Sequence, residues 1–172
     1  MATAWIGLGS NRDEPARQLC SALRHLEAVE GMTLQRTSGF YRTAPWGNTE
    51  QDFFINAVAV VETDLEPSTV LDTLLEIESR MGRRRSADRW GPRCIDLDLL
   101  TYNDLVLTTP GLELPHPRMH QRVFVLRPLL ELDGSFVIPG IGPAAIACAG
   151  LDNQEVRWLG TANEFCNGTN TP

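Results

Sequence analysis

Residues 89–102 read RWGPRCIDLDLLTY, and the second half of this stretch decides the fold. After Cys94 the sequence alternates between apolar side chains and two aspartates, Asp96 and Asp98, which is typical of a β-strand. Because successive side chains of a strand point to opposite faces, the two carboxylates share one face and lie roughly 6.6 Å apart along the chain. The apolar positions point the other way and predict a buried side: Ile95, Leu97 and Leu99. Such a strand has one face for a core and one face for charge.

Five segments before this strand alternate between strand and helix patterns. Residues 4–9 are a short apolar run, and residues 33–43 and 53–63 are rich in β-branched and aromatic side chains, as strands are. Residues 14–29 and 67–82 carry apolar side chains three and four positions apart, which predicts two amphipathic helices. The first helix would be capped by one of three polar side chains: Ser10, Asn11 or Asp13.

The resulting order is β-α-β-β-α-β, which predicts a ferredoxin-like α/β (α+β) fold whose antiparallel sheet carries both helices on one face. Further along, residues 103–117 suggest a short hairpin, residues 118–132 a helix interrupted by Pro128, and residues 143–150 a small helix. About the last 20 residues are polar and weakly patterned, so we expect them to be loose. We therefore expect one domain over residues 1–160 and a loose tail over residues 161–172.

Composition restricts the cellular context and the partners. No run approaches the roughly 20 apolar residues of a membrane span, and the N-terminus lacks the pattern of an export signal, so we expect a cytoplasmic protein with no membrane partner. The four cysteines are widely scattered and are expected to be reduced: Cys20, Cys94, Cys148 and Cys166. A net charge of −7 argues against nucleic acid as a partner.

All 15 basic residues are arginine, which excludes the lysine-dependent phosphate, Schiff-base and protein-kinase sites. Six of these arginines lie between Arg80 and Arg93, directly before the aspartate pair. Guanidinium groups suit bidentate contacts with phosphate, and Mg²⁺ bound to a polyphosphate needs only one or two protein carboxylates. Alone, either feature would fit a salt-bridged surface, but together they indicate a site for Mg²⁺ and polyphosphate.

Two other motifs are weaker. The sequence GLGSNR follows a strand as a dinucleotide fingerprint would, but the third glycine position is Arg12. His116 lies between two prolines, so a structural role and a ligand-binding role are equally open. No Gly-x-Ser-x-Gly motif is present, which leaves nucleophilic serine catalysis unsupported.

The stretch RWGPRCIDLDLLTY, together with GLGSN, SGFYRTAPWG, FINAV, RMGR and LPHPRMHQRVFVLRPLLEL, resembles the 6-hydroxymethyl-7,8-dihydropterin pyrophosphokinase family of folate biosynthesis. The resemblance covers roughly residues 4–140. It implies transfer of the β,γ-diphosphoryl unit of ATP to the hydroxymethyl group of the dihydropterin, with release of AMP and a requirement for two Mg²⁺ ions. It also implies small-molecule partners only, ATP and 6-hydroxymethyl-7,8-dihydropterin, and we expect a monomer.

The resemblance also assigns site residues. Asp96 and Asp98 match the ligands of both Mg²⁺ ions and would help to orient the attacking hydroxyl group. Arg83 and Arg93 match catalytic arginines that contact the triphosphate. Residues matching nucleotide-binding or loop-closing positions are Glu78, Arg85, Trp90, His116 and Arg122. Residues matching the pterin site are the loop Thr43, Ala44, Pro45 and Trp46, the aromatic pair Phe54 and Phe124, and the amide Asn56.

Some positions depart from the family pattern. Ser86 replaces a frequent lysine, and Leu75, Gly111 and Glu113 stand where some members have polar or basic contacts to ATP. These departures leave adenine and ribose recognition open. Two other functions also remain open: another Mg²⁺-dependent phosphoryl or nucleotidyl transferase, and a ferredoxin-like module that binds a nucleotide without turnover.

Overall fold

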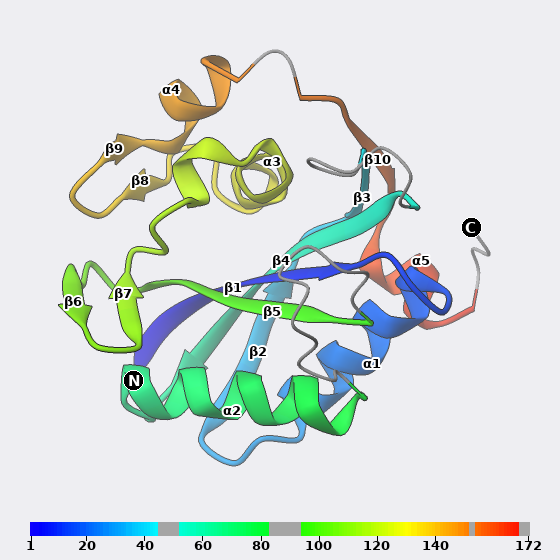
Figure 1. The fold of residues 1–172 in the computed structure, drawn as a ribbon, viewed down its shortest axis with the longest axis horizontal. Coiled ribbons are helices and arrows are strands. Elements are labelled where there is room, and N and C mark those ends of the chain that lie inside the picture. The colour runs from blue at the N-terminus through cyan, green and yellow to red at the C-terminus, as the bar shows by residue number, and fades with distance from the viewer. Residues whose placement is uncertain (45–51, 83–93, 152–153, 169–172) are drawn as a thin grey trace.

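The computed structural model describes residues 1–44, 52–82, 94–151 and 154–168, and within them six strands form one antiparallel sheet (Figure 1). The sheet contains β1 (Ala2–Ser10), β2 (Met32–Thr37), β3 (Phe40–Thr43), β4 (Phe54–Thr63), β5 (Asp96–Tyr102) and β10 (Val156–Gly160). Its order is β10-β3-β4-β1-β5, and β2 also pairs with β4. Helices α1 (Pro15–Glu27) and α2 (Pro67–Arg80) connect the strands in the predicted β-α-β-β-α-β order, except that the second expected strand is divided into β2 and β3.

Both faces of the sheet are covered (Figure 1). On one face, α1 and α2 pack on alternate strand residues such as Ile6, Leu97 and Leu99. On the other face lie α3 (Val123–Leu132) and α4 (Ala144–Ala149), packed on Trp5 and the neighbouring residues of the same cluster. The two-faced pattern of the strands therefore supports two cores, one more than the sequence predicted.

Two small hairpins extend the fold beyond the main sheet. β6 (Leu107–Thr109) pairs with β7 (Leu112–Leu114), which confirms the hairpin expected over residues 103–117. β8 (Val137–Ile138) pairs with β9 (Gly142–Pro143), and α4 follows it within the helix expected over residues 143–150.

Three local predictions need correction. The strand expected over residues 33–43 is two strands, because the backbone N–H of Val58 donates to the side chain of Ser38 at the break. The N-cap of α1 is Glu14 in a left-handed conformation (φ 59°), and no side chain among the described residues caps this helix. Finally, a 3₁₀ turn, η1 (Met119–Gln121), precedes α3, and Pro128 lies inside α3 without ending it.

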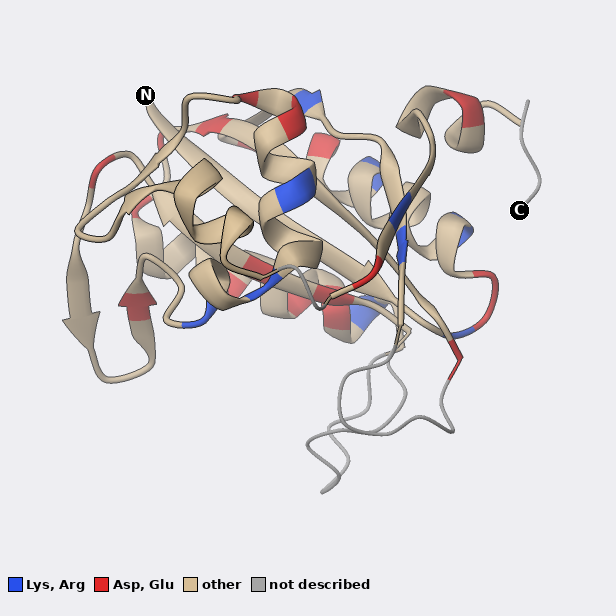
Figure 2. Cartoon of the chain, turned by 90° about the horizontal axis from the view of Figure 1, so that it is seen from above, with Lys and Arg blue, Asp and Glu red and all other residues tan. Residues whose placement is uncertain are grey.

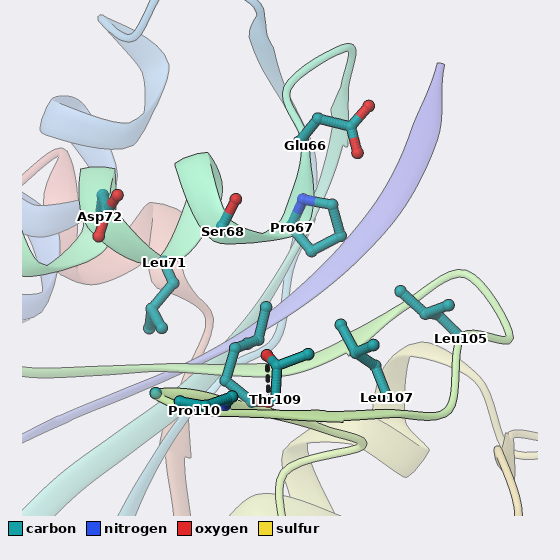
Figure 3. Close-up of a pocket in the computed structure, with 11 residues that line it drawn as sticks. Glu66, Pro67, Ser68, Leu71, Asp72, Leu105, Leu107, Thr109 and Pro110 are labelled. Carbon is teal, nitrogen blue, oxygen red and sulfur yellow. Dashed lines mark hydrogen bonds between the residues drawn. The ribbon is translucent and has the colours of Figure 1, made fainter.

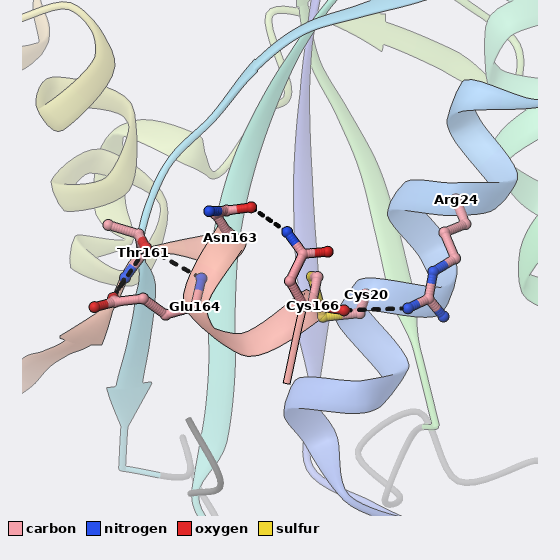
Figure 4. Close-up of a disulfide and its surroundings, with 7 residues drawn as sticks. Cys20, Arg24, Thr161, Asn163, Glu164 and Cys166 are labelled. Carbon is pink, nitrogen blue, oxygen red and sulfur yellow. Dashed lines mark hydrogen bonds between the residues drawn. A yellow bond between two sulfur atoms is a disulfide. The ribbon is translucent and has the colours of Figure 1, made fainter. Parts of the chain in front are cut away.

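Residues 154–168, within the segment that we expect to be loose, contain a strand and a helix, whereas residues 169–172 lie outside the described residues. β10 pairs with β3 at the sheet edge, and α5 (Ala162–Cys166) begins with a capping box between Thr161 and Glu164 (Figure 4). The ring of Phe165 stacks on Phe40, with 5.1 Å between the ring centroids. The segment therefore completes the sheet. The single domain over residues 1–160 stays a prediction.

A disulfide joins Cys20 of α1 to Cys166 of α5, and a guanidinium N–H of Arg24 donates to the backbone oxygen of Cys166 (Figure 4). The expectation of four reduced cysteines is wrong for this pair, whereas Cys94 and Cys148 are free thiols. The two bonded cysteines lie 146 residues apart, so their spacing carried no signal of a pairing. In the described part of the chain, no helix is both long and apolar enough to cross a bilayer.

Candidate active site

The aspartate pair lies on the sheet face that carries α3. Leu97 and Leu99 are buried against α1 and α2, at 3% and 4% exposure, so the intervening Asp96 and Asp98 point to the opposite face. This confirms the predicted division of the strand into an apolar face and an acidic face. Both aspartates are partly exposed.

Two glycines of β1 lie beside the aspartates. Gly9 pairs with Asp96 and Gly7 pairs with Asp98 in the register of β1 and β5. A glycine has no side chain, so this strip of β1 carries no side chain of its own on the α3 face, although the side chain of Leu100 lies over Gly7. On its other side, Gly9 pairs with Asn56 of β4. We call this strip, Gly7 and Gly9, the glycine floor. Sequence reasoning used these residues to weigh a dinucleotide motif and as part of the GLGSN stretch of the family resemblance, but it gave neither glycine a role in the site.

Asp98 meets two other predicted site residues. A guanidinium nitrogen of Arg122 lies 3.4 Å from Asp98 Oδ2, and His116 Nε2 lies 3.9 Å from the same oxygen. Arg122 stands between η1 and α3, and its Cζ lies 5.6 Å from the ring centroid of Phe124. The structure therefore brings together side chains from β5, the loop after β7 and the start of α3.

His116 is held in one orientation by backbone contacts. The backbone N–H of His116 donates to the backbone oxygen of Leu100, at 2.7 Å. The ring nitrogen Nδ1 accepts from the backbone N–H of Arg118, at 3.2 Å. Burial, with the nearby charges of Arg122 and Arg118, lowers the pKa of His116 to about 4, against the opposing effect of Asp96. A neutral ring that accepts at Nδ1 carries its proton on Nε2, so His116 presents a donor beside Asp98.

The predicted pterin residues lie across the glycine floor from the aspartates. Asn56 and Thr43 are buried, at 6% and 4% exposure, and the amide nitrogen of Asn56 donates to the hydroxyl oxygen of Thr43, at 2.8 Å. Phe54 lies two residues before Asn56 in β4 and so shares its face, while Ala44 is exposed at the end of β3. The structure thus places an amide and an aromatic ring opposite the acidic pair.

Glu78 lies on α2, on the opposite side of β5 from the face that carries the aspartates. This buried carboxylate of α2, 2% exposed, accepts a hydrogen bond from the backbone N–H of Leu97, at 2.7 Å. Because β5 is an edge strand, this bond satisfies an N–H group that has no strand beside it in the sheet order. Glu78 therefore supports the strand that carries the aspartates, from the side of α2.

Six predicted site residues lie outside the described residues: Pro45, Trp46, Arg83, Arg85, Trp90 and Arg93. Their assigned roles stay predictions.

The two carboxylates of β5 fit a magnesium site in which the substrate would supply the remaining ligands. Among the described residues, no group of three or more histidine, cysteine or acidic side chains could hold a metal ion by itself. Mg²⁺ keeps several waters and commonly takes one or two protein carboxylates together with substrate phosphates, so Asp96 and Asp98 match its needs.

A groove of about 470 Å³ lies between the start of α2 and the β6–β7 hairpin (Figure 3). Its lining is largely apolar, from residues such as Leu71, Leu107 and Leu112, with the carboxylates of Glu66 and Asp72 among the polar groups. None of the predicted site residues lines it, although Gly111, one of the departures from the family pattern, does. Sequence reasoning missed this groove because the hairpin and helix that form it are distant in sequence.

Comparison with known proteins identifies relatives of this chain. The family model described as 7,8-dihydro-6-hydroxymethylpterin-pyrophosphokinase matches residues 5–134. A 2-amino-4-hydroxy-6-hydroxymethyldihydropteridine pyrophosphokinase of Methylorubrum extorquens is 44% identical over 140 residues, covering 81% of this chain and 88% of the relative. The enzyme of the same name from Haemophilus influenzae is 42% identical over 139 residues, covering 81% and 86%.

The fold is similar to that of a solved two-part protein. A crystal structure of HPPK-DHPS from Plasmodium falciparum, with pteroate, matches with a TM-score of 0.69 at 15% identity. The match covers 87% of this chain and 42% of that one. At this identity it supports the fold alone, and the family follows from the sequence matches. The chain belongs to the 7,8-dihydro-6-hydroxymethylpterin-pyrophosphokinase family.

Proposed function

We propose that this protein transfers the β,γ-diphosphoryl unit of ATP to the hydroxymethyl group of 6-hydroxymethyl-7,8-dihydropterin, in tetrahydrofolate biosynthesis. The observation that carries the proposal is the glycine floor, with Asp96 and Asp98 on one side of it and Asn56 with Thr43 on the other. The floor would let the hydroxymethyl group of a bound pterin approach a polyphosphate held at the aspartates. Family membership gives independent support.

In the proposed reaction, the hydroxymethyl oxygen forms a bond to the β-phosphorus of ATP. The bond between that phosphorus and the oxygen bridging to the α-phosphate breaks, AMP leaves with the electron pair, and the hydroxyl proton is released to water. No covalent enzyme intermediate is needed, so the protein acts by positioning the substrates and stabilising charge.

Asp96 and Asp98 would hold two Mg²⁺ ions, which supply charge neutralisation for the phosphate oxygens when bound. The guanidinium of Arg122 and the Nε2–H of neutral His116 would donate to the same oxygens, because both groups already lie beside Asp98. Arg83, Arg85, Trp90 and Arg93 would contribute from the segment between α2 and β5, and Glu78 would act through the strand.

At the other end of the site, Asn56 would read the hydrogen-bonding edge of the pterin. Its amide orientation is set by Thr43, which leaves Oδ1 directed toward Gly9. Phe54 and Phe124 would stack on the two sides of the ring, and residues 43–46 would border it. Stacking supplies affinity, while the amide supplies selectivity.

We further propose that the protein acts as a monomer in the cytoplasm, with ATP and the pterin as its partners. The proposal that no nucleic acid binds rests on the net charge of −7, and basic and acidic segments are interspersed along the described ribbon (Figure 2). A nucleic-acid site would need an extended basic surface.

Product analysis tests the proposed reaction. The protein is incubated with ATP, Mg²⁺ and 6-hydroxymethyl-7,8-dihydropterin, and the products are separated by mass spectrometry. We expect AMP and the dihydropterin diphosphate in equal amounts. ADP would indicate transfer of a single phosphoryl group, pyrophosphate would indicate nucleotidyl transfer, and unchanged ATP would indicate a binding module. Each of these three results would contradict the proposal.

A further inference from the structure

The part of the chain beyond the family match reaches back to the candidate active site. The family model ends at residue 134, and the later described residues include Gln154 and the strand β10. Gln154 lies between α4 and β10, far in sequence from α3. Its side chain nevertheless makes two hydrogen bonds at the start of α3.

The two bonds hold consecutive peptide groups. The side-chain oxygen of Gln154 accepts from the backbone N–H of Val123, at 3.0 Å. Its side-chain nitrogen donates to the backbone oxygen of Gln121, at 3.2 Å. The first N–H groups of a helix have no partner within the helix, and Arg122, the N-cap of α3, provides no side-chain cap. Gln154 therefore caps α3 from another segment.

Arg122 lies between these two anchored peptide groups. It has an extended backbone (φ −121°, ψ 104°), flanked by η1 on one side and by α3 on the other. The direction of its side chain depends on both flanking segments, because a small change in the backbone dihedral angles of Arg122 moves the guanidinium at the end of its long side chain. That guanidinium is the group 3.4 Å from Asp98.

We propose that Gln154 is a positioning residue, which fixes the Gln121–Val123 backbone and thereby directs the guanidinium of Arg122 toward Asp98 and the substrate phosphates. The kinetic consequence rests on the proposed function, whereas the effect on Arg122 itself does not. Residues outside the family match thus contribute to the geometry of the site.

The kinetic test compares Gln154→Leu, which keeps the side-chain volume without its polar atoms, with the control Gln35→Leu. Gln35 is an exposed glutamine of β2 that bonds to Glu62, away from the site. We expect Gln154→Leu to lower kcat/KM for ATP roughly 10-fold, as misplacement of a binding group does. Gln35→Leu should leave it unchanged. In an Arg122→Ala background, Gln154→Leu should cost less than about twofold, because residues that act as a unit are not additive.

A second measurement tests the positioning of Arg122 without any catalytic reaction. The Nε–Hε NMR signal of Arg122, assigned by its loss in Arg122→Lys, reports the order of the guanidinium through its heteronuclear NOE. We expect this NOE to fall in Gln154→Leu and to stay unchanged in Gln35→Leu. If the wild-type protein releases no AMP, the proposed function fails, while the NMR comparison still tests the positioning.

Either of two results overturns the inference: an Arg122 signal that is unchanged in Gln154→Leu, or a loss of kcat/KM that is as large in the Arg122→Ala background as in the wild type. Gln154→Ala serves as a second variant if Gln154→Leu does not fold. A purely structural role would lower the melting temperature and the active fraction, but it would leave the Arg122 signal of the folded molecules unchanged.

Discussion

Gly9 lies directly against Asn56 in the candidate site. A Cβ atom added at Gly9 would lie 2.7 Å from Asn56 Oδ1, closer than two such atoms can approach without a shift. The amide of Asn56 cannot move freely, because its nitrogen is bonded to Thr43. The position of the Asn56 side chain, at the end of the site proposed for the pterin, therefore depends on the absence of a side chain at Gly9.

We predict that Gly9→Ala weakens binding of 6-hydroxymethylpterin roughly 10-fold, since displacing a group that reads the ligand leaves buried polar atoms poorly paired. Isothermal titration with Mg²⁺ and a non-hydrolysable ATP analogue measures the dissociation constant. Gly134→Ala is the matched control, because the nearest atom to its added Cβ is 3.8 Å away. Equal affinities in Gly9→Ala and the wild type would contradict the assignment of Asn56.

Glu78 gives a second prediction at the residue scale. Removing its carboxylate in Glu78→Ala leaves the Leu97 N–H without this acceptor, which should cost roughly 1–3 kcal/mol of unfolding free energy. Glu78→Gln retains an acceptor and should cost less. Urea denaturation followed by circular dichroism measures the difference. A Glu78→Ala variant that is as stable as the wild type, but has a raised KM for ATP, would instead support a direct nucleotide contact.

At the scale of elements, α3 is attached to β3 by a polar contact. The hydroxyl of Tyr41 in β3 donates to a carboxylate oxygen of Glu131, at 2.6 Å, and the other oxygen accepts from the backbone N–H of Gly39, at 2.9 Å. Burial, followed by the hydrogen bond to Glu131 and its negative charge, raises the pKa of Tyr41 well above its ordinary value.

This shift predicts a pH dependence with a definite sign. A folded-state pKa above the unfolded value of about 10 means that the contribution of Tyr41 is fully present below pH 10 and is lost as the pH rises further. Tyr41→Phe should therefore be less stable than the wild type at neutral pH and should lose stability less steeply above pH 10. Urea unfolding between pH 8 and pH 11 measures both slopes. Parallel slopes would contradict this role of Tyr41.

The C-terminal segment is fastened to α1 by the Cys20–Cys166 disulfide, which closes a loop of 146 residues in sequence separation. Such a link mainly restricts the unfolded chain, so Cys166→Ser should lower the unfolding free energy by roughly 2–4 kcal/mol. Cys148→Ser is the control, because Cys148 is a free thiol. Thiol counting on the unfolded, unreduced protein checks the bond itself, and four free thiols would contradict it. Disulfides are rare in reducing compartments, so this count also bears on the proposed cytoplasmic location.

Local patterns predicted the central elements correctly, because each depends on residues that are close in sequence. The alternation around Asp96 and Asp98 predicted both faces of β5, and the apolar spacing predicted α1 and α2 within two residues at their C-terminal ends. The elements that were mispredicted depend on distant partners. β10 is short and partly exposed, and it is a strand because its backbone pairs with β3.

The predictions about the candidate site divide in the same way, into residues that local motifs name and features that depend on long-range packing. The resemblance named His116 and Arg122, and the structure brings both beside Asp98. It also named Glu78, whose bond to Leu97 becomes visible only once α2 is placed against β5. The glycine floor and the cap by Gln154 arise from register and from long-range packing, so neither could be predicted from motif spacing.

At the scale of the whole molecule, the chain is a ferredoxin-like sheet with a covered apolar face and a second face divided between α3 and the candidate site. The C-terminal segment, beyond the family match, joins both regions, since β10 extends the sheet next to Thr43 and Gln154 caps α3. We expect the site to be sensitive to changes in this segment, although the reaction itself depends on the aspartate pair.

The most direct test of the central claim is the rate of AMP release by Asp98→Asn, measured with ATP, Mg²⁺ and 6-hydroxymethyl-7,8-dihydropterin at saturation. Asp104→Asn, an exposed aspartate in the loop after β5, is the control. Since an amide cannot replace a charged magnesium ligand beside a polyphosphate, we predict a fall in kcat of at least roughly 100-fold in Asp98→Asn and none in Asp104→Asn. A kcat for Asp98→Asn close to that of the wild type would contradict the claim that diphosphoryl transfer takes place on this face of the sheet.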